Sequence, residues 1–354
     1  QRLAEARGRL RLAAEALLRL GLLHEHTGEG AAAASSFAAA YFTAEAARGE
    51  AVRAEAAVHL VHVTGGGPRS AEEDALWSRL AEAVVRGRGA AADGLQAMLQ
   101  QHRSGAAMQR GDVAAALADL EAAQRLERAR LGADHPALGA IEEQLGGALA
   151  QAGRTDEALV VYARAIAGAE AALGPEHPTT ARRILGRGAV HERRGDVAAA
   201  LDDYRRALAI WERAFGEHPR LIWALTCVGR ALRRTGAPEA ALPYYARALV
   251  IAERAHGVDD PEAAYACVEL AGVSAESGRA EAARGLYARA LGILLVPREP
   301  PPLAQPLLEV AEALLADGEP GRAGAALARA RQLGVRGEEE ARAEALARAL
   351  EGGV

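Results

Sequence analysis

The hydrophobic positions of residues 178–215 predict two helices separated by a turn. Pro178 stands where a helix can begin without losing a backbone donor, and an amphipathic stretch runs from there to Arg194. Gly195 interrupts the stretch, and Asp196 is a residue type that caps helix N-termini. The second helix presents one apolar stripe at alternating spacings of three and four residues, formed by Leu201, Tyr204, Leu208, Trp211 and Phe215. A single hairpin cannot bury this stripe, so we expect it to pack against neighbouring hairpins.

The same hairpin recurs six times along the chain. The turn glycines are Gly111, Gly153, Gly195, Gly236, Gly278 and Gly318, in steps of 42, 42, 41, 42 and 40 residues. Each is followed by alanine five and twelve residues later, and by tyrosine or leucine nine residues later. Such a repeat predicts an array in which each unit packs against its neighbours.

Within one unit, the small and aromatic positions form a recognisable pattern. The unit that shows it in full has Leu145-Gly146, Gly153, Ala158, Tyr162 and Ala165. This pattern resembles the tetratricopeptide repeat, and the resemblance covers residues 98–331. The usual unit has about 34 residues. The longer period here coincides with loops that contain glycine followed by a His-Pro pair, at residues 131–136, 173–178 and 215–219. A 42-residue period with such loops is similar to the kinesin-light-chain-like subclass.

The resemblance implies an all-α fold, a right-handed α-solenoid of about eight tetratricopeptide helical hairpins with a C-terminal capping helix. Near the N-terminus, Leu20-Gly21, Gly28 and Phe37 fit one unit less regularly, and a degenerate unit should turn near residues 65–68. The proline-rich residues 296–302 should be a stiff linker before the last unit.

We therefore expect three regions along the chain. They are irregular N-terminal units over residues 1–90, a regular 42-residue array over 91–336, and a capping helix and tail over 337–354. This order is similar to the C-terminal repeat regions of serine/threonine protein kinases from GC-rich bacteria such as myxobacteria. In those proteins the kinase domain precedes the array. The chain begins with Gln1 instead of Met, which leads us to expect a piece of a longer or processed protein.

Composition limits the kinds of partner that we expect and indicates the cellular compartment. The 354 residues carry a formal net charge of −5, whereas a dedicated nucleic-acid binder usually has a strong basic excess, so we expect no nucleic-acid partner. The longest purely aliphatic run is residues 293–296, far short of the roughly 18 residues of a membrane span. Cys227 and Cys267 form no CxxC pair, which is typical of reduced core thiols in a cytoplasmic protein.

No constellation of residues indicates catalysis. The chain contains no Lys and no Asn, so it cannot build a P-loop, a Schiff-base enzyme or a kinase active site, and any kinase domain would lie outside it. It also lacks a Gly-x-Ser-x-Gly elbow and a His-Glu-x-x-His motif. His59 and His62 lack further ligands of metal-site spacing, and the loop histidines His135, His177 and His218 are interpreted as a feature of the loop. We expect no enzyme activity, no cofactor and no metal site.

The resemblance implies that the first helix of each unit lines a concave binding surface. Arginine is concentrated on these helices between residues 182 and 234, beside one tryptophan. Guanidinium groups bind carboxylates bidentately, and an aromatic neighbour adds a stacking face. We therefore predict a site for an acidic or C-terminal peptide segment, formed by Arg182, Arg193, Trp223, Arg230, Arg233, Arg234 and Tyr265. The alternative is that these arginines are solvated and paired with the chain's own glutamates.

Three classes of function follow from these observations. The favoured one is a protein–protein interaction scaffold that binds a peptide or protein, as the sensory or docking arm of a larger bacterial signalling protein such as a serine/threonine kinase. The second is a receptor for a small signalling peptide. The third, an enzyme, is disfavoured because no nucleophile, base or metal set converges in the sequence.

Overall fold

The computed structural model describes residues 2–64, 71–88, 92–133, 135–297, 303–335 and 337–352. Over these residues the chain forms 17 helices and no strand, which confirms the expected all-α solenoid. The turn expected near residues 65–68 and the linker expected at 296–302 lie, apart from residues 296 and 297, outside the described residues.

The chain divides into two compact units, Gln1–Pro175 and Glu176–Val354, which we call the N-terminal and C-terminal units. The N-terminal unit holds α1 (Arg2–Thr27), α2 (Gly30–Ala46), α3 (Glu50–Thr64), α4 (Ala71–Arg86), α5 (Asp93–Gln109), α6 (Val113–Leu131), α7 (Leu138–Gln151) and α8 (Thr155–Leu173). The C-terminal unit holds α9 (Pro178–Arg194), α10 (Val197–Phe215), α11 (Leu221–Arg234), α12 (Pro238–His256), α13 (Pro261–Glu276), α14 (Ala280–Leu294), α15 (Ala304–Ala316), α16 (Pro320–Leu333) and α17 (Glu338–Gly352). The domain boundaries expected at residues 90 and 336 stay predictions, and both fall outside the described residues.

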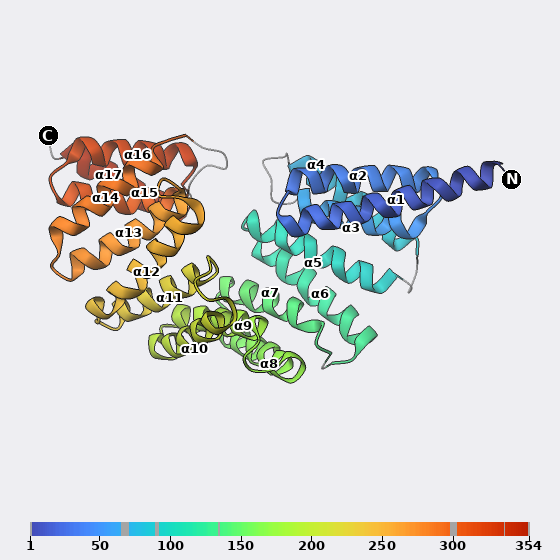
Figure 1. Cartoon of the computed structure of the whole chain (residues 1–354), viewed down its shortest axis with the longest axis horizontal. Helices are drawn as coiled ribbons and strands as arrows, with labels where there is room; N and C mark the ends of the chain where they lie inside the picture. The colour runs from blue at the N-terminus through green and yellow to red at the C-terminus, as the bar shows by residue number, and fades with distance from the viewer. Residues whose placement is uncertain are drawn as a thin grey trace. The chain divides into compact units, whose positions relative to one another are not determined.

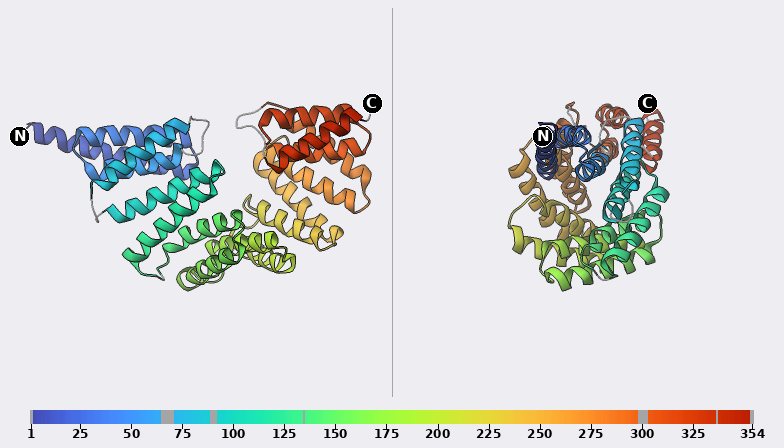
Figure 2. Two further views of the ribbon diagram at one scale, coloured as in Figure 1. Left: turned by 180° about the vertical axis from the view of Figure 1, so that it is seen from behind. Right: turned by 90° about the vertical axis from the view of Figure 1, so that its right-hand side faces the viewer.

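Consecutive helices pair as hairpins, from α1 with α2 to α15 with α16, and each hairpin packs against the next one within its unit. Figure 1 shows α13 to α17 packed together, with α13 below α16 and α17 in that view, and the left view of Figure 2 shows the same unit from behind. The final helix α17 packs on α15 and α16, where a capping helix was expected. Four of the five residues of the predicted stripe on α10 are buried; only Phe215 is partly exposed.

The glycine turns and the histidine loops end and begin these helices. Gly195 has a φ of 89°, a left-handed conformation that glycine adopts without steric cost, and Asp196 caps α10 by accepting a hydrogen bond from Ala199 N. His177 accepts a hydrogen bond from the backbone N–H of Thr179 at 3.1 Å. His135, His218 and Asp260 accept the same bond from the residue two positions later, at 3.2, 3.1 and 2.9 Å. His177 and Asp260 thereby cap α9 and α13, whereas His135 and His218 bind the backbone N–H of the residue just before α7 and α11.

The Leu-Gly step of the first helix has a packing reason. A Cβ atom added to Gly146 would lie 2.6 Å from Cε2 of Tyr162, on the second helix of the same hairpin. A Cβ atom added to Gly188 would likewise lie 2.6 Å from Cε1 of Tyr204. Because glycine has no side chain, the two helices can approach until the tyrosine ring packs against the backbone of the first helix. The glycine and the aromatic residue of the repeat are therefore in contact with each other.

Candidate functional site

The first helices of successive hairpins line a groove in the C-terminal unit. Its walls come from α9, α11 and α13, together with the beginning of α15, and its volume is about 880 Å³. Residues along the groove include Arg182, Arg220, Ile222, Trp223, Arg230, Glu262, Tyr265, Glu269, Leu303, Pro306 and Glu309. A second cleft of about 400 Å³ shares Arg230, Glu269 and Glu309 with it and continues toward α17.

The structure brings four of the seven predicted site residues to this groove: Arg182, Trp223, Arg230 and Tyr265. Arg233 lines the second cleft. Arg193 and Arg234 line neither of these two clefts, and both are exposed on the surface of the unit.

Aromatic side chains occupy the middle of the groove. Trp223 is 50% exposed, although a tryptophan side chain has a large apolar surface that proteins usually bury. The hydroxyl of Tyr265 accepts a hydrogen bond from the backbone N–H of Leu303 at 2.8 Å, which holds the beginning of α15 against α13. The Leu303 side chain is 63% exposed at the groove. The groove therefore offers an apolar surface that the described part of the chain leaves uncovered.

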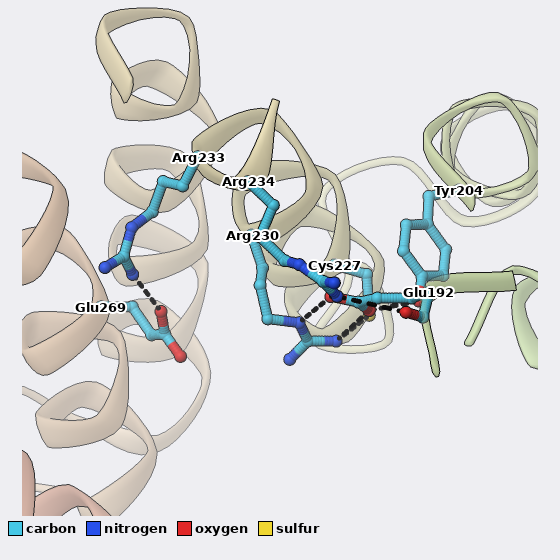
Figure 3. Close-up of polar contacts among 7 residues, drawn as sticks. All are labelled: Glu192, Tyr204, Cys227, Arg230, Arg233, Arg234 and Glu269. Atoms are coloured by element: carbon cyan, nitrogen blue, oxygen red, sulfur yellow. Dashed lines mark hydrogen bonds and ion pairs between the residues drawn. The ribbon is translucent and has the colours of Figure 1, made fainter. Parts of the chain in front are cut away.

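Two of the predicted arginines converge on one buried carboxylate, as Figure 3 shows. Arg230 binds Glu192 with both Nε, at 3.0 Å, and Nη2, at 3.2 Å. Arg234 Nη1 binds the same carboxylate at 3.1 Å, and the hydroxyl of Tyr204 donates to it at 2.7 Å. Burial by itself would raise the pKa of Glu192, but these hydrogen bonds and the charge of Arg230 outweigh it and lower that pKa.

The third arginine of this cluster turns the other way, toward α13 (Figure 3). Arg233 forms a bidentate ion pair with Glu276, at 2.9 and 2.5 Å, and its Nη1 also reaches Glu269 at 3.4 Å. Arg230, Arg233 and Arg234 are thus paired with glutamates of the chain itself, which is the alternative that the sequence left open. Arg230 and Arg234 share the single negative charge of Glu192, whereas Arg233 has Glu276 and Glu269.

Sequence reasoning missed the three acidic residues of the groove, Glu262, Glu269 and Glu309. Glu269 lies four residues after Tyr265 on α13, so the helical period alone would have placed both on one face. Glu309 and Leu303 carry no such signal, because they follow a proline-rich stretch of the sequence that the other units lack.

The histidines pair with a carboxylate and with one another. In the N-terminal unit, Glu25 forms ion pairs with His59 Nδ1 at 3.0 Å and with His62 Nε2 at 3.4 Å. His102 on α5 lies against His62, with 4.5 Å between the ring centroids. Across the described ranges, no group of three or more His, Cys, Asp or Glu side chains has the geometry to hold a metal ion. Of the helices in those ranges, none combines the length and apolar character that a membrane crossing requires.

Comparison with known proteins supports the repeat assignment. Residues 138–212, 180–249 and 224–295 match the model of a family described as tetratricopeptide repeat, so this part of the chain consists of tetratricopeptide repeats. No curated protein matches the sequence. Tetratricopeptide arrays generally mediate binding of proteins or peptides, and such scaffolds are generally not enzymes.

Solved structures of low sequence identity share the fold. One is a putative kinesin light chain with nearly identical TPR-like repeats from Podosopora anserina, at 21% identity and a TM-score of 0.50, covering 55% of this chain and 92% of that one. Another is BtubC (BKLC) from P. vanneervenii, at 20% identity and a TM-score of 0.56, covering 64% and 91%. The apo form of RapI, at 13% identity and a TM-score of 0.56, covers 78% and 97%. At these identities the likeness concerns the fold alone.

Proposed function

We propose that this chain is a protein-interaction module that holds a peptide or protein segment in the groove of its C-terminal unit. The observation that carries the proposal is the half-exposed Trp223, which lies in the groove with Tyr265 and the exposed Leu303. Large, partly exposed aromatic side chains in a concave site are the usual anchors of protein recognition. The repeat fold supports the same class of function.

The preference for an acidic segment is a narrower part of the proposal. Arg230, Arg233 and Arg234 are committed to glutamates of the chain, so a partner carboxylate would have to compete with Glu192, Glu269 or Glu276. Arg182 lines the groove and is exposed. We assign the acidic contact to this exposed guanidinium, with Arg193, exposed on the same helix, as a second cation.

In its wider setting, we propose that the module is the cytoplasmic docking or sensory arm of a bacterial signalling protein such as a serine/threonine kinase. The order of irregular and regular repeats along the chain supports this placement. A second candidate function is a receptor for a small signalling peptide. The volume of the groove, about 880 Å³, favours it, because clefts that enclose small ligands measure about 300–1,000 Å³.

The test compares partners captured from a lysate of the native host by three immobilised proteins: the wild type, Trp223→Ala and Phe42→Ala. Phe42 is 60% exposed on α2 in the other unit, so its variant is a matched control for loss of an exposed aromatic side chain. We expect mass spectrometry to find a partner that the wild type and Phe42→Ala retain and that Trp223→Ala loses. A folded protein would favour the scaffold, and a short peptide the receptor. Partners retained equally by all three proteins would contradict the groove as the binding site.

A further inference from the structure

The two walls of the groove carry opposite charges. The wall formed by α9 and α11 has Arg182 and Arg220, both exposed. Arg220 stands immediately before α11 with its guanidinium over the ring of Phe215, 5.4 Å from the centroid. The wall formed by α13 and α15 has Glu269 and Glu309 instead. A segment that crosses this groove therefore meets a basic surface on one side and an acidic surface on the other.

The acidic wall is only partly neutralised by the chain itself. Glu269 pairs with Arg233 at 3.4 Å and lies within the influence of the Arg230 charge, but the Arg233 guanidinium makes its two shorter bonds to Glu276. Glu309 accepts a hydrogen bond from the amide of Gln305 at 3.0 Å, and the charge of Arg342 acts on it from α17. Burial and the nearby charge of Glu309 raise the pKa of Glu269. Two carboxylates that disfavour each other's charge are stabilised when a cation is placed between them.

The space beside this acidic pair suits a long side chain. Glu269 and Glu309 line both the groove and the second cleft, so they stand where the two spaces meet. Trp223 and Tyr265 line the groove, and Arg342 of α17 lines the second cleft. Tyr265 and Glu269 are four residues apart on α13, so they lie about 6 Å apart on one face of the helix. A lysine or arginine side chain can span such a distance, with its apolar stem on the ring and its charge at the carboxylate.

We propose that the segment bound in this groove carries an arginine or lysine whose charge lies between Glu269 and Glu309, next to a large apolar side chain that packs on Trp223. The inference rests on the proposed function, because it names the chemistry of the segment held at the same site. An acidic residue of the same segment can face Arg182 and Arg220, which makes the ligand one of mixed charge. A purely acidic segment would place like charges against Glu269 and Glu309, which is unfavourable at a partly buried surface.

The experiment uses the whole chain and a defined set of probes. The probes are hexapeptides of alanine with acetylated and amidated ends. Each peptide contains one Leu, Phe or Trp and one Arg, Lys, Asp or Glu, and the set as a whole covers every pair of positions. The peptides that bind best are then titrated, at fixed salt, against the wild type, Glu269→Gln/Glu309→Gln, Glu309→Gln alone and Trp223→Ala. The control Glu239→Gln/Glu281→Gln removes the same net charge from exposed positions at the beginning of α12 and α14. Circular dichroism checks that each variant is folded.

We expect the best peptides to combine Arg or Lys with a large apolar residue. The double glutamine variant should weaken them by about tenfold, the size of one lost charge-assisted hydrogen bond, while the control variant binds as the wild type does. The single Glu309→Gln variant should show part of the loss even if the double variant folds poorly. If the best peptides are acidic, or if the glutamine variants leave binding of the basic ones unchanged, the inference is wrong, and the proposed function still stands when Trp223→Ala abolishes binding. If no hexapeptide binds, the inference is wrong, and the capture experiment alone decides the proposed function. If Trp223→Ala affects neither peptide binding nor capture, both are wrong.

Discussion

Gly146 and Gly147 are neighbours on α7, yet only Gly146 is required by the packing of its hairpin. A Cβ at Gly146 would overlap the ring of Tyr162, at 2.6 Å, whereas a Cβ at Gly147 would meet only the hydroxyl of that ring, at 3.8 Å. Since a helix must move to accept an overpacked side chain, the two positions should respond in opposite directions to the same substitution.

We predict that Gly146→Ala lowers the free energy of unfolding by about 1–3 kcal/mol, the usual cost of overpacking a core contact. Gly147→Ala should leave it unchanged or raise it by up to about 1 kcal/mol, because alanine has the higher helix propensity. Urea unfolding followed by circular dichroism measures both. Equal effects of the two substitutions would mean that the ring of Tyr162 does not set the approach of the helices.

At the scale of the element, one loop side chain caps the first helix in two of the hairpins, at α9 and α13. His177 and Asp260 occupy equivalent places before Pro178 and Pro261, and each accepts a hydrogen bond from the backbone N–H two residues later. Histidine can accept this bond through a neutral ring nitrogen, and aspartate through a carboxylate oxygen. The residue type differs between the loops, but the interaction is the same.

This equivalence predicts the outcome of two substitutions at His177. His177→Ala should destabilise the C-terminal unit by about 1 kcal/mol, because the first turn of α9 loses its cap. His177→Asp should restore most of this loss, since the carboxylate also favours the positive end of the helix dipole. Thermal unfolding of the wild type and the two variants provides the comparison. A result in which both variants lose the same stability would show that the histidine does more than cap the helix.

At the scale of the whole molecule, the N-terminal unit contains a cluster of histidines that respond to acid. In the N-terminal unit His102 packs against His62 and His59, which pair with Glu25. Burial, followed by the charges of His62 and His59, lowers the pKa of His102 from 6.5 to about 3. Below pH 6.5 the unfolded chain therefore takes up a proton at His102 that the folded chain excludes until about pH 3. The contribution of His102 makes the N-terminal unit less stable as the pH falls through this window.

We predict that acidification from pH 7 to pH 5.5 lowers the free energy of unfolding of the N-terminal unit by about 1 kcal/mol through His102. The reason is that pH 5.5 lies about one unit below the ordinary pKa of this side chain. Hydrogen exchange of α3 and α5, corrected for the intrinsic effect of pH, should rise in the wild type and much less in His102→Leu. His26→Leu, at an exposed position of α1, is the control and should behave as the wild type does. An unchanged response in His102→Leu would place the acid sensitivity elsewhere.

The sequence by itself determined the features of this protein that depend on neighbours within one hairpin. The turn at Gly195, the cap at Asp196 and the apolar stripe of α10 were all predictable, because helix periodicity and capping act over a few residues. The repetition of these signals was enough to predict an all-α solenoid and the tetratricopeptide repeats of residues 138–295.

Only the tertiary structure decided which charged side chains are already paired. Arg230 binds Glu192, which is 38 residues away, and Arg233 binds Glu276, which is 43 residues away, so no local pattern reveals either pair. The structure also brought Glu309 and Leu303 to the groove, although a proline-rich stretch that the other units lack separates them from α14 in the sequence. Ion pairs and groove walls depend on distances between separate hairpins, and these distances are set by the packing of whole helices rather than by the spacing of residues along the chain.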